Sequence, residues 1–157
     1  MNLSSGDDEL LMQKIAKDSD YKVKFCVEQD AIVKTNSNKT ISDFFQQRKR
    51  WASKGLFYSN KSLVIKLILI YMFYLGIYAQ LFLSFFNPIF ILTFLLTIGF
   101  KLLFELLILK KGKRILFEKL ELKYFFVTEL LQIPYIIFTG IFGLFGSYLW
   151  KSRRIRR

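Results

Sequence analysis

Two long apolar runs constrain the fold of this chain more than any other feature. Residues 63–86 and 89–109 are almost entirely apolar, and only Asn87 and Pro88 separate them. A helix rises about 1.5 Å per residue, so about 20 apolar residues span the hydrocarbon core of a bilayer. Each run is long enough for one crossing, and Asn-Pro favours a tight turn between them. We therefore predict a transmembrane helical hairpin over residues 63–109.

A third apolar run extends from about Phe125 to Trp150. A basic linker, residues 110–124, precedes it, and residues 125–157 comprise the run and a basic tail. Gln132 and Pro134 interrupt the first part of the run. The sequence leaves open whether this run crosses the membrane or re-enters it, because a full crossing would export the basic tail against the positive-inside rule.

Charged and small residues also occur inside the apolar runs. Lys101 and Glu105 are four residues apart, so a helix places them on one face. We expect a neutralising pair near the membrane interface; a polar contact lining a path for sugar is the alternative. Gly140, Gly143 and Gly146 recur at every third residue. They predict a smooth stripe that another helix can approach closely, rather than a substrate site.

Basic residues cluster at the ends of the apolar runs. The chain has 24 Lys and Arg against 12 Asp and Glu, a net charge of +12. Juxtamembrane Lys and Arg favour the cytoplasmic side and anionic lipid, so we place residues 1–62 and the linker in the cytoplasm. We expect a multi-pass protein of the cytoplasmic (inner) membrane with lipids as partners, and no nucleic-acid binding. The clustered residues are Arg48, Lys49, Arg50, Lys54, Lys61, Lys110, Lys111, Lys113, Arg114, Lys151, Arg153, Arg154, Arg156 and Arg157.

The chain has no histidine and a single cysteine, Cys26. These counts exclude an intrachain disulfide, zinc sites built from Cys and His, and Ser-His or Cys-His nucleophile pairs. Acid–base chemistry must therefore use carboxylates, Lys or Tyr. We predict no metal-ligating residue in this chain.

The polar part of the chain, before the first apolar run, predicts a small α+β region. Acidic residues favour the start of a helix at about residues 8–17. Residues 21–27 and 31–35 are rich in β-forming side chains and predict two short strands. Thr40 or Ser42 can cap a further helix. The predicted fold class is a mainly α membrane protein with a small α+β cytoplasmic part.

The pentad Gln47-Arg48-Lys49-Arg50-Trp51 lies on that further helix, just before the first apolar run. Gln47, Arg50 and Trp51 are three and four residues apart and share one helical face. Arginine offers forked donors to phosphate oxygens, and an indole packs on the apolar face of a sugar. Arg48 and Lys49 are expected to face solvent or lipid headgroups. The alternative is a basic amphipathic helix on the membrane surface, with Trp51 as an interfacial anchor.

The order of these motifs supports a family resemblance. Gly6-Asp7-Asp8-Glu9-Leu10-Leu11, two short strands, and the pentad followed by membrane helices resemble membrane-bound family 2 glycosyltransferases. Cellulose-, chitin-, hyaluronan- and poly-N-acetylglucosamine-synthase-like bacterial enzymes belong to this family. The terminal Trp150-Lys151-x-Arg153 is similar to the end of bacterial members. The resemblance covers essentially the whole chain, but only the C-terminal half of a family member.

The resemblance implies a role for each of these residues. An acidic residue of the first motif is the general base of an inverting transfer, and its second position corresponds to Asp8, with Asp7 beside it. A carboxylate at hydrogen-bond distance suits this role, although both could merely favour a helix N-terminus. Gln47 and Arg50 would hold the nucleotide diphosphate and the acceptor end, and Trp51 would stack on the acceptor sugar. The implied substrates are a nucleotide-sugar and a glycan or lipid-linked acceptor.

A complete family member differs from this chain in one large respect. It carries, before the acidic motif, a doubly wound α/β core with an Asp-x-Asp motif that binds Mg²⁺ or Mn²⁺. No such core precedes Asp7 here, so the cytoplasmic part would be a remnant of a GT-A domain. We expect a fragment of a longer enzyme, or a chain that needs a separate donor-binding half, with no cofactor of its own and no transfer alone. The alternative is a non-catalytic membrane scaffold or subunit with a basic surface helix.

Overall fold

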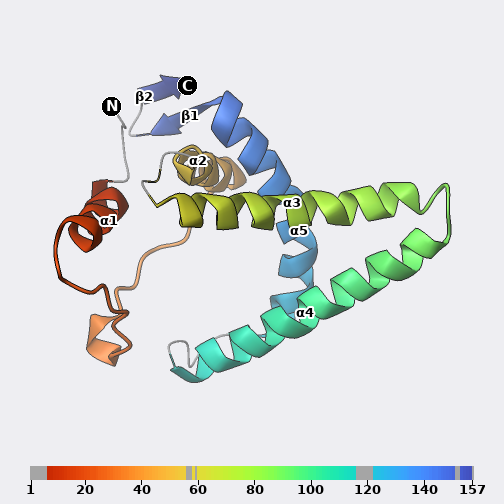
Figure 1. Ribbon diagram of the computed structural model, residues 1–157, viewed down its shortest axis with the longest axis horizontal. Coiled ribbons are helices and arrows are strands. Elements are labelled where there is room, and N and C mark those ends of the chain that lie inside the picture. Colours follow the sequence, from red (N-terminus) through yellow and green to blue (C-terminus); the bar gives the residue numbers. More distant parts are fainter. Residues whose placement is uncertain (1–6, 56–57, 59, 116–121, 151–152, 157) are drawn as a thin grey trace. The chain divides into compact units, whose positions relative to one another are not determined.

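Helices form most of the chain in its computed structural model, and a small antiparallel sheet follows the last of them (Figure 1). The structure describes residues 7–55, 58, 60–115, 122–150 and 153–156. The chain divides into two units: one holds residues 1–26, 34–70 and 138–157, and the other holds residues 27–33 and 71–137.

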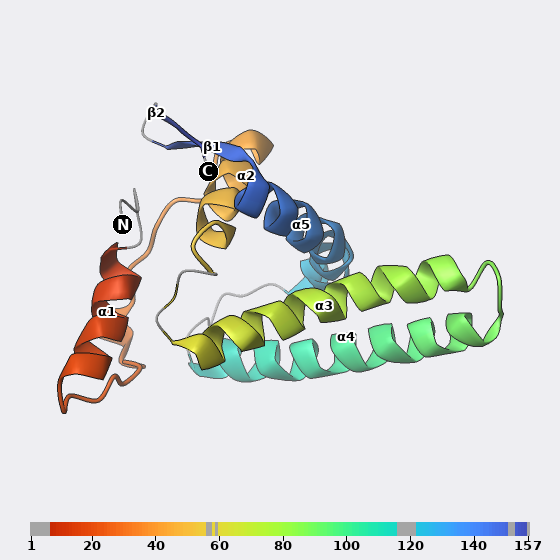
Figure 2. The same ribbon diagram turned by 45° about the horizontal axis from the view of Figure 1, so that its top comes forward.

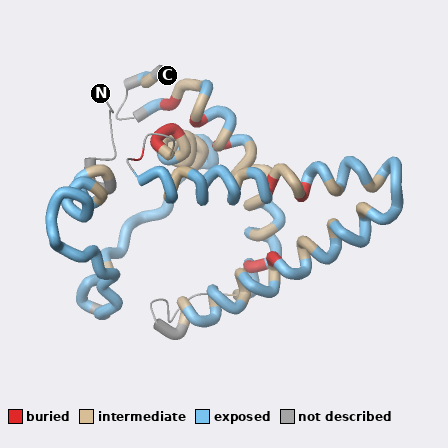
Figure 3. The backbone as a smooth tube through the Cα atoms, in the orientation of Figure 1, coloured by how far each residue is buried: buried red, intermediate tan, exposed pale blue. Residues whose placement is uncertain are grey.

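Three of the helices are long and apolar enough to cross a membrane: α3, α4 and the stretch that contains α5. Most of their apolar side chains are exposed on the chain (Figure 3), as expected for surfaces that lipid covers. The prediction of a mainly α chain is therefore confirmed, and the three helices agree with a multi-pass membrane protein. The helices are α1 (Asp7–Asp18), α2 (Ile41–Ala52), α3 (Lys61–Leu83), α4 (Ile89–Ile115) and α5 (Phe125–Phe145), with the short 3₁₀ helices η1 (Gln29–Ala31) and η3 (Leu122–Tyr124).

The predicted hairpin is formed by α3 and α4. The Asn87 side chain accepts a hydrogen bond from the Ile89 backbone N–H at 3.0 Å and so starts α4. The Thr97 hydroxyl donates to the Gln80 side chain at 3.1 Å and links the two helices near the turn. α4 continues to Ile115, beyond the apolar run, because lysines and arginine are good helix formers.

The prediction of two strands at residues 21–27 and 31–35 is wrong. Neither segment is a strand; only the short helix η1 interrupts an irregular path. A strand is stable only beside a partner that takes up its backbone hydrogen bonds and covers one face. Here Tyr21 and Phe25 are 78% exposed and Val33 is 84% exposed. β-Forming composition alone therefore did not produce a sheet in this part of the chain.

The two described strands lie instead after α5, where we expected only the end of the third apolar run and a tail. β1 (Ser147–Trp150) and β2 (Arg153–Arg156) pair antiparallel, with Ser147 opposite Arg156 and Trp150 opposite Arg153. The third helix therefore ends at Phe145, earlier than predicted. Hereafter the C-terminal hairpin means β1 and β2.

β1 of the C-terminal hairpin and the end of α5 pack against α2 (Figure 2). A Cβ atom added at Gly143 of α5 would lie 2.7 Å from the Ala52 Cβ and 2.9 Å from the Lys49 carbonyl oxygen of α2. Real Cβ atoms do not approach so closely, so only glycine allows this contact. The prediction that the glycine stripe admits another helix is confirmed at Gly143.

Candidate functional site

Local hydrogen bonds fix both ends of α2, the helix that carries the pentad. The Thr40 hydroxyl accepts from the Asp43 backbone N–H at 3.0 Å and donates to the Asp43 carboxylate at 2.8 Å, which confirms the predicted cap. At the other end Ser53 is fully buried. Its hydroxyl donates to the Arg50 carbonyl at 2.8 Å. The pentad therefore lies on a helix that is anchored at both ends.

Gln47, Arg50 and Trp51 lie on α2, so their spacing places them on one side of the helix. The Gln47 side-chain oxygen accepts a hydrogen bond from the Asn38 amide at 3.0 Å. Arg50 is half-buried, and Trp51 is 46% exposed. A ligand can therefore reach the indole of Trp51. The shared face is as predicted, while the substrate roles of the three residues stay predictions.

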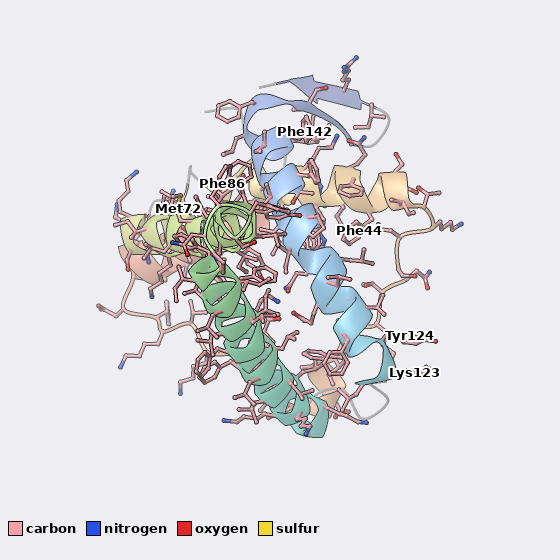
Figure 4. The ribbon with its side chains drawn as sticks, turned by 90° about the vertical axis from the view of Figure 1, so that its right-hand side faces the viewer. Phe44, Met72, Phe86, Lys123, Tyr124 and Phe142 are labelled. Atoms are coloured by element: carbon pink, nitrogen blue, oxygen red, sulfur yellow. The ribbon has the colours of Figure 1, made fainter. Side chains whose placement is uncertain are left out.

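Arg48 occupies a position that the sequence analysis did not expect. Its guanidinium lies 4.5 Å from the centre of the Trp51 ring and 4.9 Å from that of Phe44, whose ring stands on α2 in Figure 4. Cations over aromatic faces contribute about 0.5–1 kcal/mol at exposed sites. Arg48 therefore braces the indole rather than facing only solvent or lipid. The signal was present in the sequence as an aromatic residue four before and three after an arginine.

A second set of contacts joins α2 to β1. The Gln46 side-chain oxygen accepts from the Leu149 backbone N–H at 3.0 Å. The Lys49 ammonium donates to the Ser147 carbonyl at 3.4 Å, so Lys49 is not a freely solvated cation. Sequence patterns did not predict these contacts, because about a hundred residues separate the partners and no local periodicity reports such a distance.

The predicted catalytic residues Asp7 and Asp8 are the first residues of α1. Their side chains lie outside the part of the chain that the structure describes. Among the described residues, α1 forms no packed interface with α2. The pairing of Asp8 with the pentad in one active site therefore stays a prediction.

A buried polar cluster lies in the other unit, around Lys101 of α4. The Lys101 ammonium donates to the Glu105 carboxylate at 2.7 Å and to the Gln132 side-chain oxygen at 2.8 Å. It also pairs with the Glu129 carboxylate, and its nitrogen lies 5.7 Å from the centre of the Tyr74 ring. Lys101 is only 6% exposed. We call these five residues the Lys101 cluster.

The Lys101 cluster confirms the predicted pair of Lys101 and Glu105 and corrects its setting. α4 extends to Ile115, so Lys101 lies near the middle of the helix rather than toward its end. Glu129 and Gln132 come from α5, and their contact with Lys101 was not predicted. A carboxylate and an amide three residues apart in an apolar run were the available signal. The arrangement ties α4 to α5 through charge-assisted hydrogen bonds.

The described residues offer no group of three or more His, Cys, Asp or Glu side chains that could hold a metal ion. Asp18-Ser19-Asp20 has the pattern Asp-x-Asp, but both aspartates are exposed at the end of α1. They also follow the acidic motif in the sequence, whereas the metal motif of the family precedes it. These residues do not fit the metal site of a complete glycosyltransferase.

Comparison of the chain with known protein families, with curated proteins and with solved structures finds no match. A function can therefore be inferred only from the motifs of the sequence and from the geometry around α2.

Proposed function

We propose that this chain forms the membrane-anchored acceptor side of an inverting glycosyltransferase. The enzyme would transfer a sugar from a nucleotide-sugar to a glycan or lipid-linked acceptor at the cytoplasmic face of the inner membrane. The observation that carries the proposal is the accessible indole of Trp51, braced by Arg48, on the same side of α2 as Gln47 and Arg50. This helix directly precedes a helix able to cross the membrane.

The side chains on α2 suit the two ends of a sugar transfer. Arg50 offers forked, charge-assisted donors to the diphosphate that leaves, and Gln47 offers an amide to the acceptor. The face of the Trp51 indole packs on the apolar face of the acceptor sugar. The proposal thus gives α2 the tasks of holding the leaving group and aligning the acceptor.

Asp8, with Asp7 beside it, is the proposed general base. Its carboxylate takes the proton of the acceptor hydroxyl while that oxygen attacks the anomeric carbon. The bond from the anomeric carbon to the diphosphate breaks, the nucleoside diphosphate leaves, and the configuration inverts. The family resemblance implies that the donor-binding part holds Mg²⁺ or Mn²⁺. In this proposal that part belongs to a preceding segment or a separate chain. No step assigned to this chain uses a metal.

Transfer of a labelled sugar by membranes of the source organism tests the proposal. Asp8→Asn removes the base and is expected to lower the rate by about 10²–10⁴-fold. Trp51→Ala is expected to raise the acceptor KM by about tenfold or more, because the stacking surface is lost. Asp18→Asn on the same helix and Tyr21→Ala at an exposed aromatic side chain are the matched controls.

Loss of transfer in the two test variants, with protein levels and both controls at wild-type values, supports the proposal. Transfer that is indifferent to Asp8→Asn and Trp51→Ala contradicts it. That result would favour a membrane scaffold or subunit that carries a basic surface helix.

A further inference from the structure

α2 has two faces with different contacts. Successive helical residues are about 100° apart, so Gln46, Lys49 and Ala52 form one stripe along the helix. All three lie against the C-terminal hairpin or the end of α5: Gln46 binds the Leu149 N–H, Lys49 binds the Ser147 carbonyl, and Ala52 meets Gly143. We call this stripe the docking face.

Gln47 and Trp51 lie on the side of α2 away from the docking face, and Arg50 lies between the two sides, about 40° from Gln46. A helix cannot turn about its axis while one face is hydrogen-bonded and packed at three successive turns. The docking face therefore fixes the direction in which the proposed site faces. Two of its contacts are to backbone atoms of β1, and these atoms are present whatever side chains the strand carries.

The same contacts restrict how the chain crosses the membrane. α2 is polar and precedes the first apolar helix, whereas β1 follows the third. Two segments that pack together lie on the same side of a membrane. The chain between Ala52 and Ser147 therefore crosses an even number of times, and the three apolar helices cannot all be crossings.

The distribution of basic residues identifies the helix that does not cross. Lys110, Lys111 and Lys113 lie in the last turns of α4, shortly before α5, and the C-terminal hairpin carries several arginines, so both ends of α5 have cytoplasmic signals. The turn between α3 and α4 has no basic residue. α3 and α4 therefore cross as a pair, and α5 does not cross, because both of its ends lie on one side.

We infer that the C-terminal hairpin fixes the orientation of the α2 site and that both ends of α5 lie on one side of the membrane. The first part rests on the proposed function, and the second does not. Gln46, Lys49 and Gly143 are positioning residues in this account, because they act on the substrate only through the orientation of α2.

Cysteine labelling tests the topology. In a Cys26→Ser background, which removes the single exposed cysteine, new cysteines replace the exposed residues Ser42 of α2, Phe86 of the turn and Leu149 of β1. A membrane-impermeant maleimide is added to intact and to permeabilised cells. We expect Leu149→Cys to behave like Ser42→Cys, labelled only after permeabilisation, and Phe86→Cys to be labelled in intact cells.

The inference would be overturned if Leu149→Cys and Phe86→Cys were labelled under the same condition and Ser42→Cys under the other, because α5 would then cross. If Ser42→Cys and Leu149→Cys are both labelled in intact cells and Phe86→Cys is not, the shared side is supported and the cytoplasmic assignment is wrong.

Two substitutions at Gln46 test the positioning role. Gln46→Leu removes the acceptor of the Leu149 N–H and is expected to raise the acceptor KM about fivefold, with kcat unchanged. Gln46→Glu keeps an acceptor oxygen and is expected to restore the KM. An equal KM for wild type and Gln46→Leu would overturn the positioning role.

Failure of the proposed function leaves a separate readout. If wild-type membranes transfer no sugar, the fluorescence emission of Trp51 is measured in place of KM. The Gln46 variants are then compared in a Trp150→Phe background, where Trp51 is the single tryptophan. A shift with Gln46→Leu that Gln46→Glu reverses supports the docking face, and unchanged emission in both variants overturns it.

Discussion

Two basic side chains, Arg48 on α2 and Lys101 in α4, are stabilised in different ways. Arg48 is half-buried and lies over the rings of Phe44 and Trp51. Lys101 is almost fully buried and is surrounded by two carboxylates, an amide and an aromatic ring. A cation that keeps part of its hydration can rest on aromatic faces, whereas a cation in an apolar helix needs opposite charge and saturated hydrogen bonds.

This difference separates the roles of the two regions. The α2 surface leaves Trp51 accessible and so can act on a ligand. In the Lys101 cluster, the ammonium of α4 binds a carboxylate of its own helix and a carboxylate of α5, and so joins the two helices. We therefore expect substitutions in the Lys101 cluster to change stability most. Substitutions around Arg48 should change stability little and should mainly change the environment of the Trp51 indole.

The largest effect is expected from Lys101→Met. This change removes the cation and leaves the Glu105 and Glu129 carboxylates facing each other. Breaking a buried ion pair typically costs about 3–5 kcal/mol. Chemical denaturation in detergent measures the loss, and Lys66→Met, at an exposed lysine near the start of α3, is the control.

The triple variant Lys101→Met, Glu105→Gln, Glu129→Gln sharpens this test. It removes all three charges and is expected to recover most of the stability, because no unpaired charge remains. A Lys101→Met protein as stable as the Lys66→Met protein would refute the structural role of the cluster.

The second effect concerns packing on the α2 side. Gly143→Leu places a side chain where even a Cβ meets Ala52 and the Lys49 carbonyl, and overpacking typically costs about 1–3 kcal/mol. Gly99→Leu is a matched control, since a Cβ at Gly99 of α4 meets nothing within 4 Å. Thermal unfolding of the two variants should differ, with Gly143→Leu less stable. Equal melting temperatures would disprove the close approach of α5 and α2.

The smallest effect on stability is expected from Arg48→Ala, at about 0.5–1 kcal/mol. The indole should respond more clearly. In a Trp150→Phe background, the emission of Trp51 should shift toward that of a hydrated indole, and soluble quenchers should reach it better. Lys39→Ala, at an exposed lysine before α2, serves as the comparison. Identical quenching of Trp51 in both variants would show that Arg48 does not brace the ring.

Features set by local sequence were predictable. The apolar runs and the Asn-Pro turn predicted α3 and α4, and Thr40 predicted the start of α2, because length, periodicity and caps act over a few residues. The shared face of Gln47, Arg50 and Trp51 followed from helical spacing alone.

Features that need a distant partner were not predictable. Residues 21–27 have the composition of a strand, yet the fold supplies no neighbour for them. Gly143 indicated a close approach without naming α2, and Glu129 gave no sign that Lys101 was its partner. The C-terminal hairpin was hidden because its basic residues had a sufficient explanation as a cytoplasmic tail.

The ratio of sugar-transfer rates of Asp8→Asn and Asp18→Asn membranes tests the central claim most directly. The two substitutions make the same chemical change on the same helix, and only one removes the proposed base. The account predicts that Asp8→Asn transfers at least about 10²-fold more slowly than Asp18→Asn, at equal protein levels. Equal rates for the two variants would contradict a glycosyltransferase site in this chain.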